Sequence, residues 1–354
     1  MLVYYYQNKK GKTHKMNNLN TLKTEFLSQY ALASKLTKDK YKRELELFLD
    51  VCDIHTNDDL NSINQETVNK FYEYAEKNEW SPCTINQRLG VIKLFTSWCF
   101  KKHYTNDDIF ADVKRMRTAN FVHYVPSELE CDTLLEYIKT HKEGKRLYLM
   151  TKLMLMTGLR RMEICNLKIS DLDKENSVIR IEGKGKKFVE QPVPSSIVVE
   201  LVEYINTERR LVMEKYKAIG GKDKDYLFVS GIGDKVNTET KDLKNGNKVN
   251  DNGFYQQVKR YAKLAGIDNW DKISVHSLRR RAGTSIYEKT GDIRTAQEFL
   301  RHSSITTTEQ CYINYNKDKL KNAVNEIYED KTNNLSNDEE YQLFLLLKKK
   351  FANM

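Results

Sequence analysis

The chain has 354 residues, of which 40% are hydrophobic, and this is enough to build a core in each of two or three domains. The composition therefore excludes a disordered chain. Lys and Arg exceed Asp and Glu by ten, while the low counts of Pro and Gly (4 and 15) favour a mainly helical protein. The positive charge is compatible with a nucleic-acid partner but does not by itself identify one.

Neither secretion nor membrane insertion is indicated. The opening residues have no basic region ahead of a short apolar run, and no stretch approaches the ~18 apolar residues of a membrane span. The six cysteines lie far apart, without a C-x-x-C pair or a histidine at ligand spacing. We therefore expect a cytoplasmic protein with reduced thiols and no metal site.

The first part of the chain has a basic segment and then a run of helices. Residues 1–18 are expected to form a flexible basic arm, and 19–117 carry apolar residues at helical spacing, which predicts a small helical domain. Ser81 followed by Pro82 marks one helix start. The polar face of that helix either enters a DNA groove or is an ordinary solvated surface. Its candidate DNA contacts are Thr84, Asn86, Arg88 and Lys93.

A linker over 118–126 separates this domain from a mixed second one at 127–330. Helices are expected at about 127–141, 146–157 and 160–167, and a hairpin spans 178–192 with its turn at 183–186. Residues 226–229 are a candidate third strand. The predicted fold class is thus mainly α with a small antiparallel β-sheet (α+β), and 331–354 is expected to form an amphipathic helix.

The residues that indicate chemistry lie in the second domain. His276 and Arg279 are three residues apart, which is a spacing that places both on one helix face. Arg160 follows a Gly at the junction of two predicted helices, where a side chain can face a cleft. A second histidine, His302, precedes Tyr312 by ten residues.

In these residues and their order the sequence resembles the tyrosine recombinases, a family that includes phage integrases and Xer-type resolvases. The shared features are a T-G-L-R-x-x-E box at 157–163, Lys184 in a G-K-G turn, H-x-L-R at 276–279, His302 and Tyr312. The helical first half resembles the family's core-binding domain. The resemblance implies a two-domain clamp around duplex DNA that carries out site-specific recombination or integration.

The resemblance assigns a role to each residue of a phosphoryl transfer. Tyr312 would attack the scissile phosphate and hold a 3′-phosphotyrosine, while Arg160 and Arg279 would grip the non-bridging oxygens. Lys184 would protonate the leaving 5′ oxygen. The remaining members are His276, which would help take the tyrosine proton, His302, which would hydrogen-bond the phosphate, and Glu163, which would orient the arginine or a histidine.

This chemistry implies no metal and no ATP, because the bond to tyrosine conserves the phosphodiester energy. Two alternatives remain at this point: type IB topoisomerase-like DNA relaxation, and a non-catalytic DNA-binding architectural protein. Tyr315 is a second candidate nucleophile, although spacing favours Tyr312. Arg301 stands where the family commonly has Gly, so the backbone beside His302 is expected to differ.

Double-stranded DNA with a specific site is the expected partner. Placement beside the hairpin turn, after Arg279 and on first-domain helices suggests further backbone contacts at Lys42, Arg43, Lys186, Lys187, Arg280 and Arg281. The family also implies a homo-tetramer on two DNA sites, formed from monomers or dimers. The C-terminal helix would dock either on a neighbouring protomer or on its own domain. Phage or transposon integration, excision and chromosome-dimer resolution all remain open.

Overall fold

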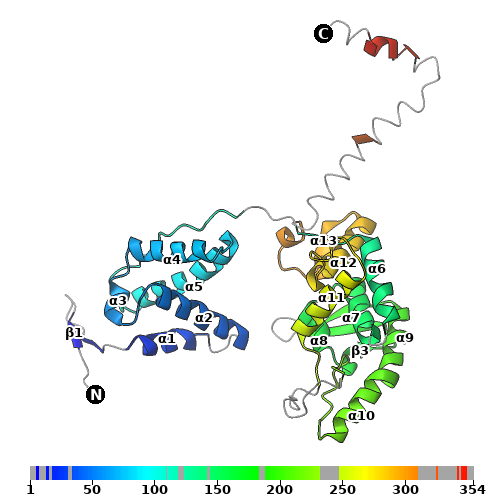
Figure 1. Cartoon of the computed structure of the whole chain (residues 1–354), viewed down its shortest axis with the longest axis horizontal. Coiled ribbons are helices and arrows are strands. Elements are labelled where there is room, and N and C mark those ends of the chain that lie inside the picture. The colour runs from blue at the N-terminus through cyan, green and yellow to red at the C-terminus, as the bar shows by residue number, and fades with distance from the viewer. Residues whose placement is uncertain are drawn as a thin grey trace. The chain divides into compact units, whose positions relative to one another are not determined.

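The structure of the protein is a computed structural model, and it divides into two compact units, Met1–Asn120 and Phe121–Met354 (Figure 1). The residues that the structure describes are 5–7, 13–15, 18–30, 34–108, 110–118, 123–141, 144–182, 188–231, 247–309, 324–325, 341–342 and 344–348. Among them, no helix is both long enough and apolar enough to cross a membrane.

The first unit is a helical domain around an aromatic core. Phe48 packs edge-on against Phe71 and Phe110, with ring centroids 5.8 and 5.3 Å apart. Phe26 packs in the same way against Phe95 at 5.3 Å. The helices are α1 (Leu19–Ser28), α2 (Lys35–Val51), α3 (Asn57–Asn61), α4 (Gln65–Lys77) and α5 (Pro82–Lys101).

Two further features of this unit bear on the predictions. The Ser81 side chain accepts a hydrogen bond from the backbone N–H of Thr84, with Pro82 in the first turn, so α5 begins where the sequence predicted. Before α1, β1 (Tyr5–Gln7) pairs antiparallel with β2 (Thr13–Lys15). The described part of the expected arm is therefore a short two-stranded ribbon.

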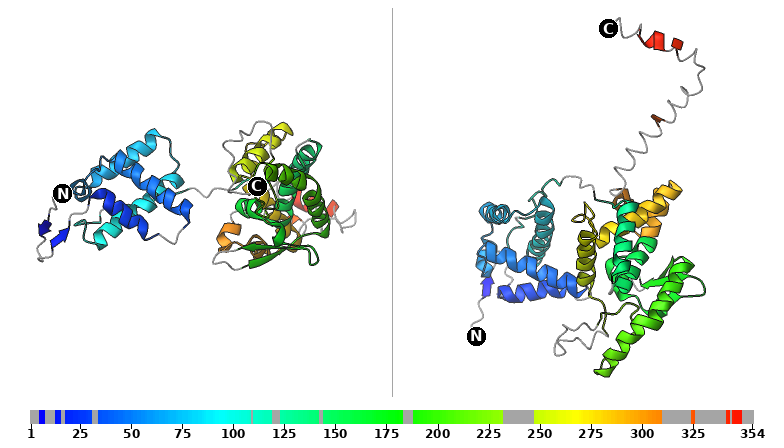
Figure 2. Two further views of the ribbon diagram at one scale, coloured as in Figure 1. Left: turned by 90° about the horizontal axis from the view of Figure 1, so that it is seen from below. Right: turned by 45° about the vertical axis from the view of Figure 1, so that its right-hand side comes forward.

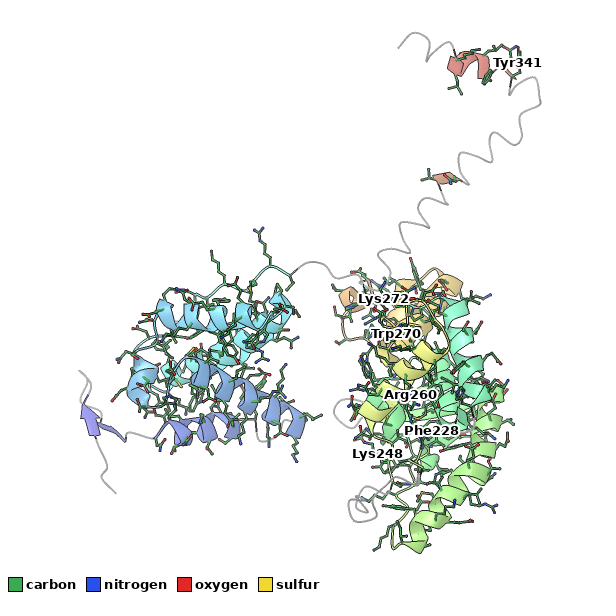
Figure 3. All side chains as sticks on the ribbon, viewed as in Figure 1. Phe228, Lys248, Arg260, Trp270, Lys272 and Tyr341 are labelled. Carbon is green, nitrogen blue, oxygen red and sulfur yellow. The ribbon has the colours of Figure 1, made fainter. Side chains whose placement is uncertain are left out.

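In the second unit, most helices pack around one apolar core. α12 packs against both α7 and α13, and Leu278 of α12 is fully buried. Phe228, labelled in Figure 3, is also fully buried and its ring lies 5.7 Å from that of Tyr204. The helices are α6 (Glu128–Thr140), α7 (Gly144–Thr157), α8 (Arg161–Asn166), α9 (Ser195–Tyr204), α10 (Arg210–Ala218), α11 (Asp251–Leu264), α12 (Val275–Thr290) and α13 (Ile293–Leu300).

A small antiparallel sheet completes the second unit, in the order β3 (Leu172–Asp173), β4 (Val178–Glu182), β5 (Phe188–Pro192). The predicted pairing of β4 with β5 is confirmed, with Ile179 opposite Gln191, and the predicted turn at 183–186 lies outside the described residues. The third strand was predicted at 226–229, and this was wrong. Its residues Tyr226 and Val229 make only isolated bridges, to Lys168 and Lys248, because the edge of β4 is already paired with β3.

One helical rod of this unit has an irregular centre. α9 continues through a π-helical turn (Ile205–Arg209) into α10, which extends away from the rest of the unit in Figure 1 and in the right-hand view of Figure 2. Arg209 in that turn is buried and pairs with Asp223 at 2.7 Å. The rod is anchored by this pair and takes no part in the site described next.

Candidate active site

The site begins at the junction between α7 and α8. α7 ends at Thr157, whose hydroxyl donates to the carbonyl of Leu153 at 2.6 Å. Gly158 then adopts φ +59°, and a Cβ at that position would lie 2.8 Å from Leu300 Cδ2. Only glycine combines this left-handed backbone with so close an approach of α13, so the turn directs the next side chain toward that helix.

Arg160 occupies the N-cap position of α8 and is bound to Glu163 one turn later. The carboxylate accepts from the Arg160 backbone N–H at 2.7 Å and from its Nη1 at 2.8 Å. The Arg160 side chain is 46% exposed, and that of Glu163 only 16%. Glu163 therefore fixes the guanidinium while leaving part of it open to solvent.

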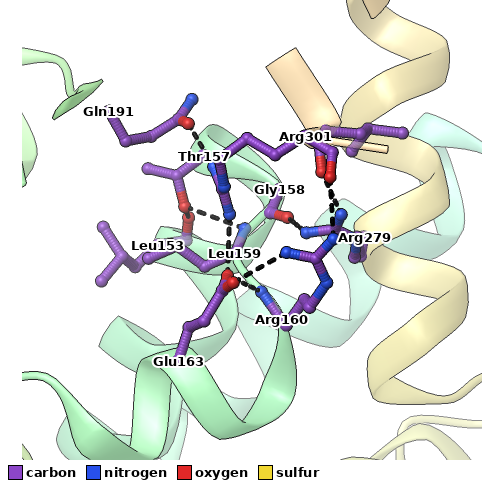
Figure 4. Close-up of polar contacts among 10 residues, drawn as sticks. Leu153, Thr157, Gly158, Leu159, Arg160, Glu163, Gln191, Arg279 and Arg301 are labelled. Atoms are coloured by element: carbon purple, nitrogen blue, oxygen red, sulfur yellow. Dashed lines mark hydrogen bonds and ion pairs between the residues drawn. The ribbon is translucent and has the colours of Figure 1, made fainter. Parts of the chain in front are cut away.

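Arg279 lies on α12 and is buried, with 6% of its surface exposed. Its Nη1 donates to the carbonyl of Gly158 and its Nη2 to the carbonyl of Leu300 (Figure 4). Ser274 caps α12 by accepting a hydrogen bond from the N–H of Ser277 at 3.1 Å. This cap fixes the start of the helix and hence the position of Arg279 on it. The two carbonyls thus hold Arg279 at the same turn that presents Arg160.

The end of α13 is the second support of the site. Arg301 follows the helix with φ 53° and ψ 46°, which is the left-handed conformation usual for glycine. Its carbonyl accepts from Arg160 Nη2 at 2.8 Å, and its own guanidinium donates to Glu163 Oε2 at 2.7 Å and to Gln191 Oε1 (Figure 4). That the backbone beside His302 differs from that of the family stays a prediction; Arg301 itself adopts a left-handed conformation, which favours glycine.

His302 is partly buried beside these arginines. Its Nδ1 lies 3.0 Å from the hydroxyl of Thr308, which is fully buried. Burial, together with the charges of Arg279, Arg160 and Arg301, lowers the pKa of His302 to about 4. The imidazole is therefore neutral at physiological pH and can both accept and donate a hydrogen bond.

Glu163 and His276 have pKa values below their usual range for different reasons. Burial alone would raise the pKa of Glu163, but the hydrogen bond from the Arg160 backbone and the charge of Arg301 lower it, so the carboxylate stays ionised. His276 is exposed by surface area, yet the protein atoms around its ring partly desolvate it. This desolvation and the charges of Arg161, Arg280 and Arg279 lower its pKa.

The structure thus brings together Arg160, Glu163, Arg279 and His302, with His276 one turn before Arg279 on α12. Lys184 and Tyr312 lie outside the described residues, as do Lys186 and Lys187. Chemically, the cluster offers two fixed guanidiniums and two neutral imidazoles. This combination can bind a phosphodiester anion and move a proton beside it.

The sequence did not predict three residues whose side chains hold the site in place: Arg301, Gln191 and Thr308. Arg301 reaches Glu163 across 138 positions, so no local pattern indicates the contact. The departure from glycine at this position was its only signal, and it pointed to a change of backbone rather than to a side-chain contact.

Several candidate DNA contacts of the first unit also have internal partners. Arg88 lies 3.0 Å from the buried Glu44 and 3.9 Å above the Trp80 ring. These contacts favour a structural role over the predicted phosphate contact. The other candidates make contacts closer to the surface. Asn86 exchanges two hydrogen bonds with the backbone of Met116, the hydroxyl of Thr84 lies 2.9 Å from Ser81 Oγ, and Lys93 donates to the carbonyl of Ala111. Two form ion pairs: Lys42 lies 3.8 Å from Glu46, and Arg43, which is 73% exposed, lies 3.0 Å from Glu44.

A groove of about 630 Å³ runs along α5 in the first unit. Its basic lining comes from Lys40 on α2, Lys93 and Lys101 on α5, and Arg115 beyond α5. Asn86 also lines it. Of the polar face predicted for α5, Asn86 and Lys93 therefore line a groove with four basic side chains, whereas Thr84 and Arg88 do not line it.

In the second unit, both arginines that follow Arg279 are bound to protein groups. Arg280 Nη1 donates to the carbonyl of Tyr124 at 2.9 Å. Arg281 is buried and pairs with Glu128 at 3.2 Å and with Glu288. Because its charge is compensated inside the domain, Arg281 fits a structural role better than the predicted DNA contact.

Comparison with known proteins agrees with both halves of the chain. Residues 127–319 match the Phage integrase family, and residues 24–103 match the model described as "Phage integrase, N-terminal SAM-like domain". The chain is similar to the tyrosine recombinase XerA of Pyrococcus furiosus, with 31% identity over 228 residues that cover 63% of this chain and 70% of that protein.

Two solved structures show the same fold. The Tn1549 transposon integrase in complex with a circular intermediate DNA aligns with TM-score 0.63 and 16% identity, over 82% of this chain and 93% of that one. A lambda integrase tetramer bound to a Holliday junction aligns with TM-score 0.59 and 13% identity, over 87% and 92%.

The family match and the fold place the chain among enzymes that cleave and rejoin DNA. The chain belongs to the phage integrase family: it is a tyrosine recombinase, which cleaves and rejoins DNA in site-specific recombination through a tyrosine intermediate. The predicted α+β integrase fold is confirmed.

Proposed function

We propose that Tyr312 is the nucleophile and that Arg160 and Arg279 bind the non-bridging oxygens of the scissile phosphate. The observation that supports this most is the joint anchoring of both arginines at the turn of Leu300 and Arg301. Guanidiniums fixed before DNA binds need no reorganisation when charge develops on the phosphate. The phosphate would lie on the open side of Arg160.

The proton transfers fall to three further residues. We propose that Lys184 protonates the leaving 5′ oxygen and that His276, neutral because its pKa is lowered, helps to take the proton of Tyr312. His302 hydrogen-bonds the phosphate. Glu163 orients Arg160 through the bonds described above. Neither a metal nor ATP enters this scheme.

Covalent capture on nicked DNA tests the scheme without knowledge of the target site. The probe is a pool of nicked duplexes with a randomised central segment. It is incubated with the full chain in the presence of a metal chelator and in the absence of ATP. When the short cleaved strand diffuses away, the protein remains attached, and the captured DNA is sequenced. We expect attachment to a defined sequence. No attachment to any member of the pool would contradict the proposal.

Recombination is then distinguished from relaxation with the captured sequence. Two duplexes of unequal length that both carry this sequence should yield recombinant products. A type IB topoisomerase would relax a supercoiled plasmid without joining the two duplexes, and that outcome would favour the alternative.

We propose that the duplex backbone lies in the basic groove of the first unit. The candidate contacts there are Lys93 and Asn86, predicted from sequence, and Lys40, Lys101 and Arg115, which line the same groove. Lys42, Arg43, Lys186, Lys187 and Arg280 also remain proposed DNA contacts. Replacing Lys40 and Lys101 by Ala should reduce the salt-dependence slope of binding by roughly one for each lost phosphate contact. Lys77→Ala, outside the groove, is the matched control.

We further propose a homo-tetramer on two DNA sites in the cytoplasm, with 1–18 as a basic arm, 19–117 as the core-binding domain and 127–330 as the catalytic domain. The lambda integrase tetramer on a Holliday junction supports this assembly by analogy. Tyr341, Phe344 and Leu346 are 61, 58 and 67% exposed, so the C-terminal segment has apolar surface available for a neighbour. Deleting 336–354 should leave cleavage intact but impair recombination of two sites; unimpaired recombination would exclude docking on a neighbour.

A further inference from the structure

Arg301 is held in a backbone conformation that disfavours it. Its φ of 53° and ψ of 46° are in the left-handed region, where a residue with a Cβ is strained and glycine is not. α13 could end at this turn with a glycine and lose nothing in the backbone. The arginine side chain must therefore contribute something that glycine cannot.

The contribution is a second cation beside Glu163. Arg301 Nη2 lies 2.7 Å from Glu163 Oε2, while Arg160 Nη1 lies 2.8 Å from Glu163 Oε1. The two guanidiniums thus share one carboxylate, one oxygen each, and the backbone N–H of Arg160 also donates to Oε2. Arg301 also donates to Gln191 Oε1 on β5, which fixes its guanidinium in a largely buried position, 13% exposed.

The formal charges show why this sharing matters for a phosphate. A pair of Arg160 and Glu163 alone is neutral and attracts an anion only weakly. With Arg301 the three side chains carry one net positive charge, and Arg160, which is the exposed member, presents it. In partly buried surroundings such a charge acts more strongly than it would in water.

The backbone of Arg301 adds an orienting contact. Its carbonyl accepts a hydrogen bond from Arg160 Nη2 at 2.8 Å (Figure 4). The same residue therefore holds the Arg160 guanidinium with its backbone and pairs with Glu163, the counter-ion of Arg160, with its side chain. Both actions are directed at Arg160.

We propose that Arg301 is a positioning residue for strand cleavage: by sharing the charge of Glu163 it gives the three side chains one net positive charge, and through its carbonyl it orients Arg160 for the scissile phosphate. This inference rests on the proposed role of Arg160. It assigns Arg301 no contact with the DNA.

A charge-rescue experiment separates this role from a purely structural one. The rate of covalent attachment to the captured nicked duplex is measured at saturating DNA for the unsubstituted chain, for Arg301→Gly, for Glu163→Gln and for the double variant. Glycine suits the left-handed backbone, so Arg301→Gly is expected to fold. Arg301→Lys, which retains the charge, provides the conservative variant, and thermal unfolding is recorded for each protein.

Arg301→Gly should slow attachment by about 10–100-fold, as loss of a residue that supports a functional group commonly does. The double variant should be faster than Arg301→Gly, because removing the carboxylate restores one net positive charge beside the phosphate. Arg301→Lys should recover part of the rate.

Two results would overturn the assignment alone: an unchanged rate in Arg301→Gly, or a double variant slower than Arg301→Gly, as expected if the ion pairs only stabilise the fold. No attachment by the unsubstituted chain would contradict the proposed function and this assignment together.

Discussion

The carbonyl oxygen of Arg301 accepts a hydrogen bond of 2.8 Å from Nη2 of Arg160, a residue 141 positions earlier in the chain. The neighbouring carbonyl of Leu300 accepts from Arg279. The turn after α13 therefore sets the spacing between the two guanidiniums, and His302 follows it directly. A displacement of this turn would disturb both arginines and the histidine at once.

Replacing Arg160 by Lys keeps the charge but removes the planar guanidinium that can bind two atoms at once. Lys cannot hold both Glu163 and the Arg301 carbonyl while it contacts a phosphate. We expect covalent attachment to slow by about 100-fold. Arg210→Lys, at an exposed position on α10, is the matched control and should leave the rate unchanged. Equal rates for both variants would argue against a phosphate contact by Arg160.

Gly158→Ala tests the backbone of the same junction. The new Cβ would lie 2.8 Å from Leu300 Cδ2 at a residue whose φ is +59°. We expect the free energy of unfolding of the second unit to fall by about 2–4 kcal/mol in urea titrations. Gly90→Ala is the control: a Cβ within α5 meets nothing within 4 Å and should stabilise the first unit by about 0.5–1 kcal/mol. An unchanged free energy of unfolding in Gly158→Ala would show that the turn can relax.

The role of Lys184 as a general acid can be tested by changing the leaving group. Lys184→Ala should strongly slow cleavage of an ordinary strand, because its 5′ oxygen leaves as an alcohol and needs a proton. A strand with sulfur at the 5′ bridging position leaves as a thiolate, which is much less basic. With that substrate the variant should approach the rate of the unsubstituted chain. A defect of equal size on both substrates would exclude the general-acid role.

His302 should make stability depend on pH. Its pKa is lowered to about 4 in the folded protein, against about 6.5 in the unfolded chain. Protonation of His302 therefore favours unfolding. The stability that the neutral imidazole contributes is fully present above pH 6.5 and is lost as the pH falls toward 4. Between pH 7 and 5 the unsubstituted chain should lose about 1–2 kcal/mol more than His302→Gln, measured by urea unfolding. Equal losses would show that His302 is not held neutral.

Most of the fold could be predicted because its signals are local. Ser81 with Pro82, and Ser127 with Glu130, mark helix starts that the structure has at α5 and α6. Alternation at 178–181 predicted β4. The third strand could not be found in this way, because Leu172 and Asp173 form a strand only through pairing with β4, and two residues carry no periodicity.

The candidate site was predictable in its reacting groups but not in its supports. Arg160 and Arg279 follow from motifs, since the chemistry requires those residue types. Their anchors are the carbonyls of Gly158, Leu300 and Arg301, and main-chain acceptors leave no trace in a sequence. Sequence also assigned Arg281 to DNA without its two carboxylate partners, which become visible only in the folded domain.

Identifying the residue that carries the covalent bond to DNA is the sharpest test of the proposed cleavage mechanism. The adduct trapped on the nicked duplex is digested with a protease, and the peptide attached to the DNA is identified by mass spectrometry. We predict a 3′-phosphate linked to Tyr312, with the adduct lost in Tyr312→Phe and retained in Tyr315→Phe. An adduct that persists in Tyr312→Phe, or that maps to another residue, would contradict it.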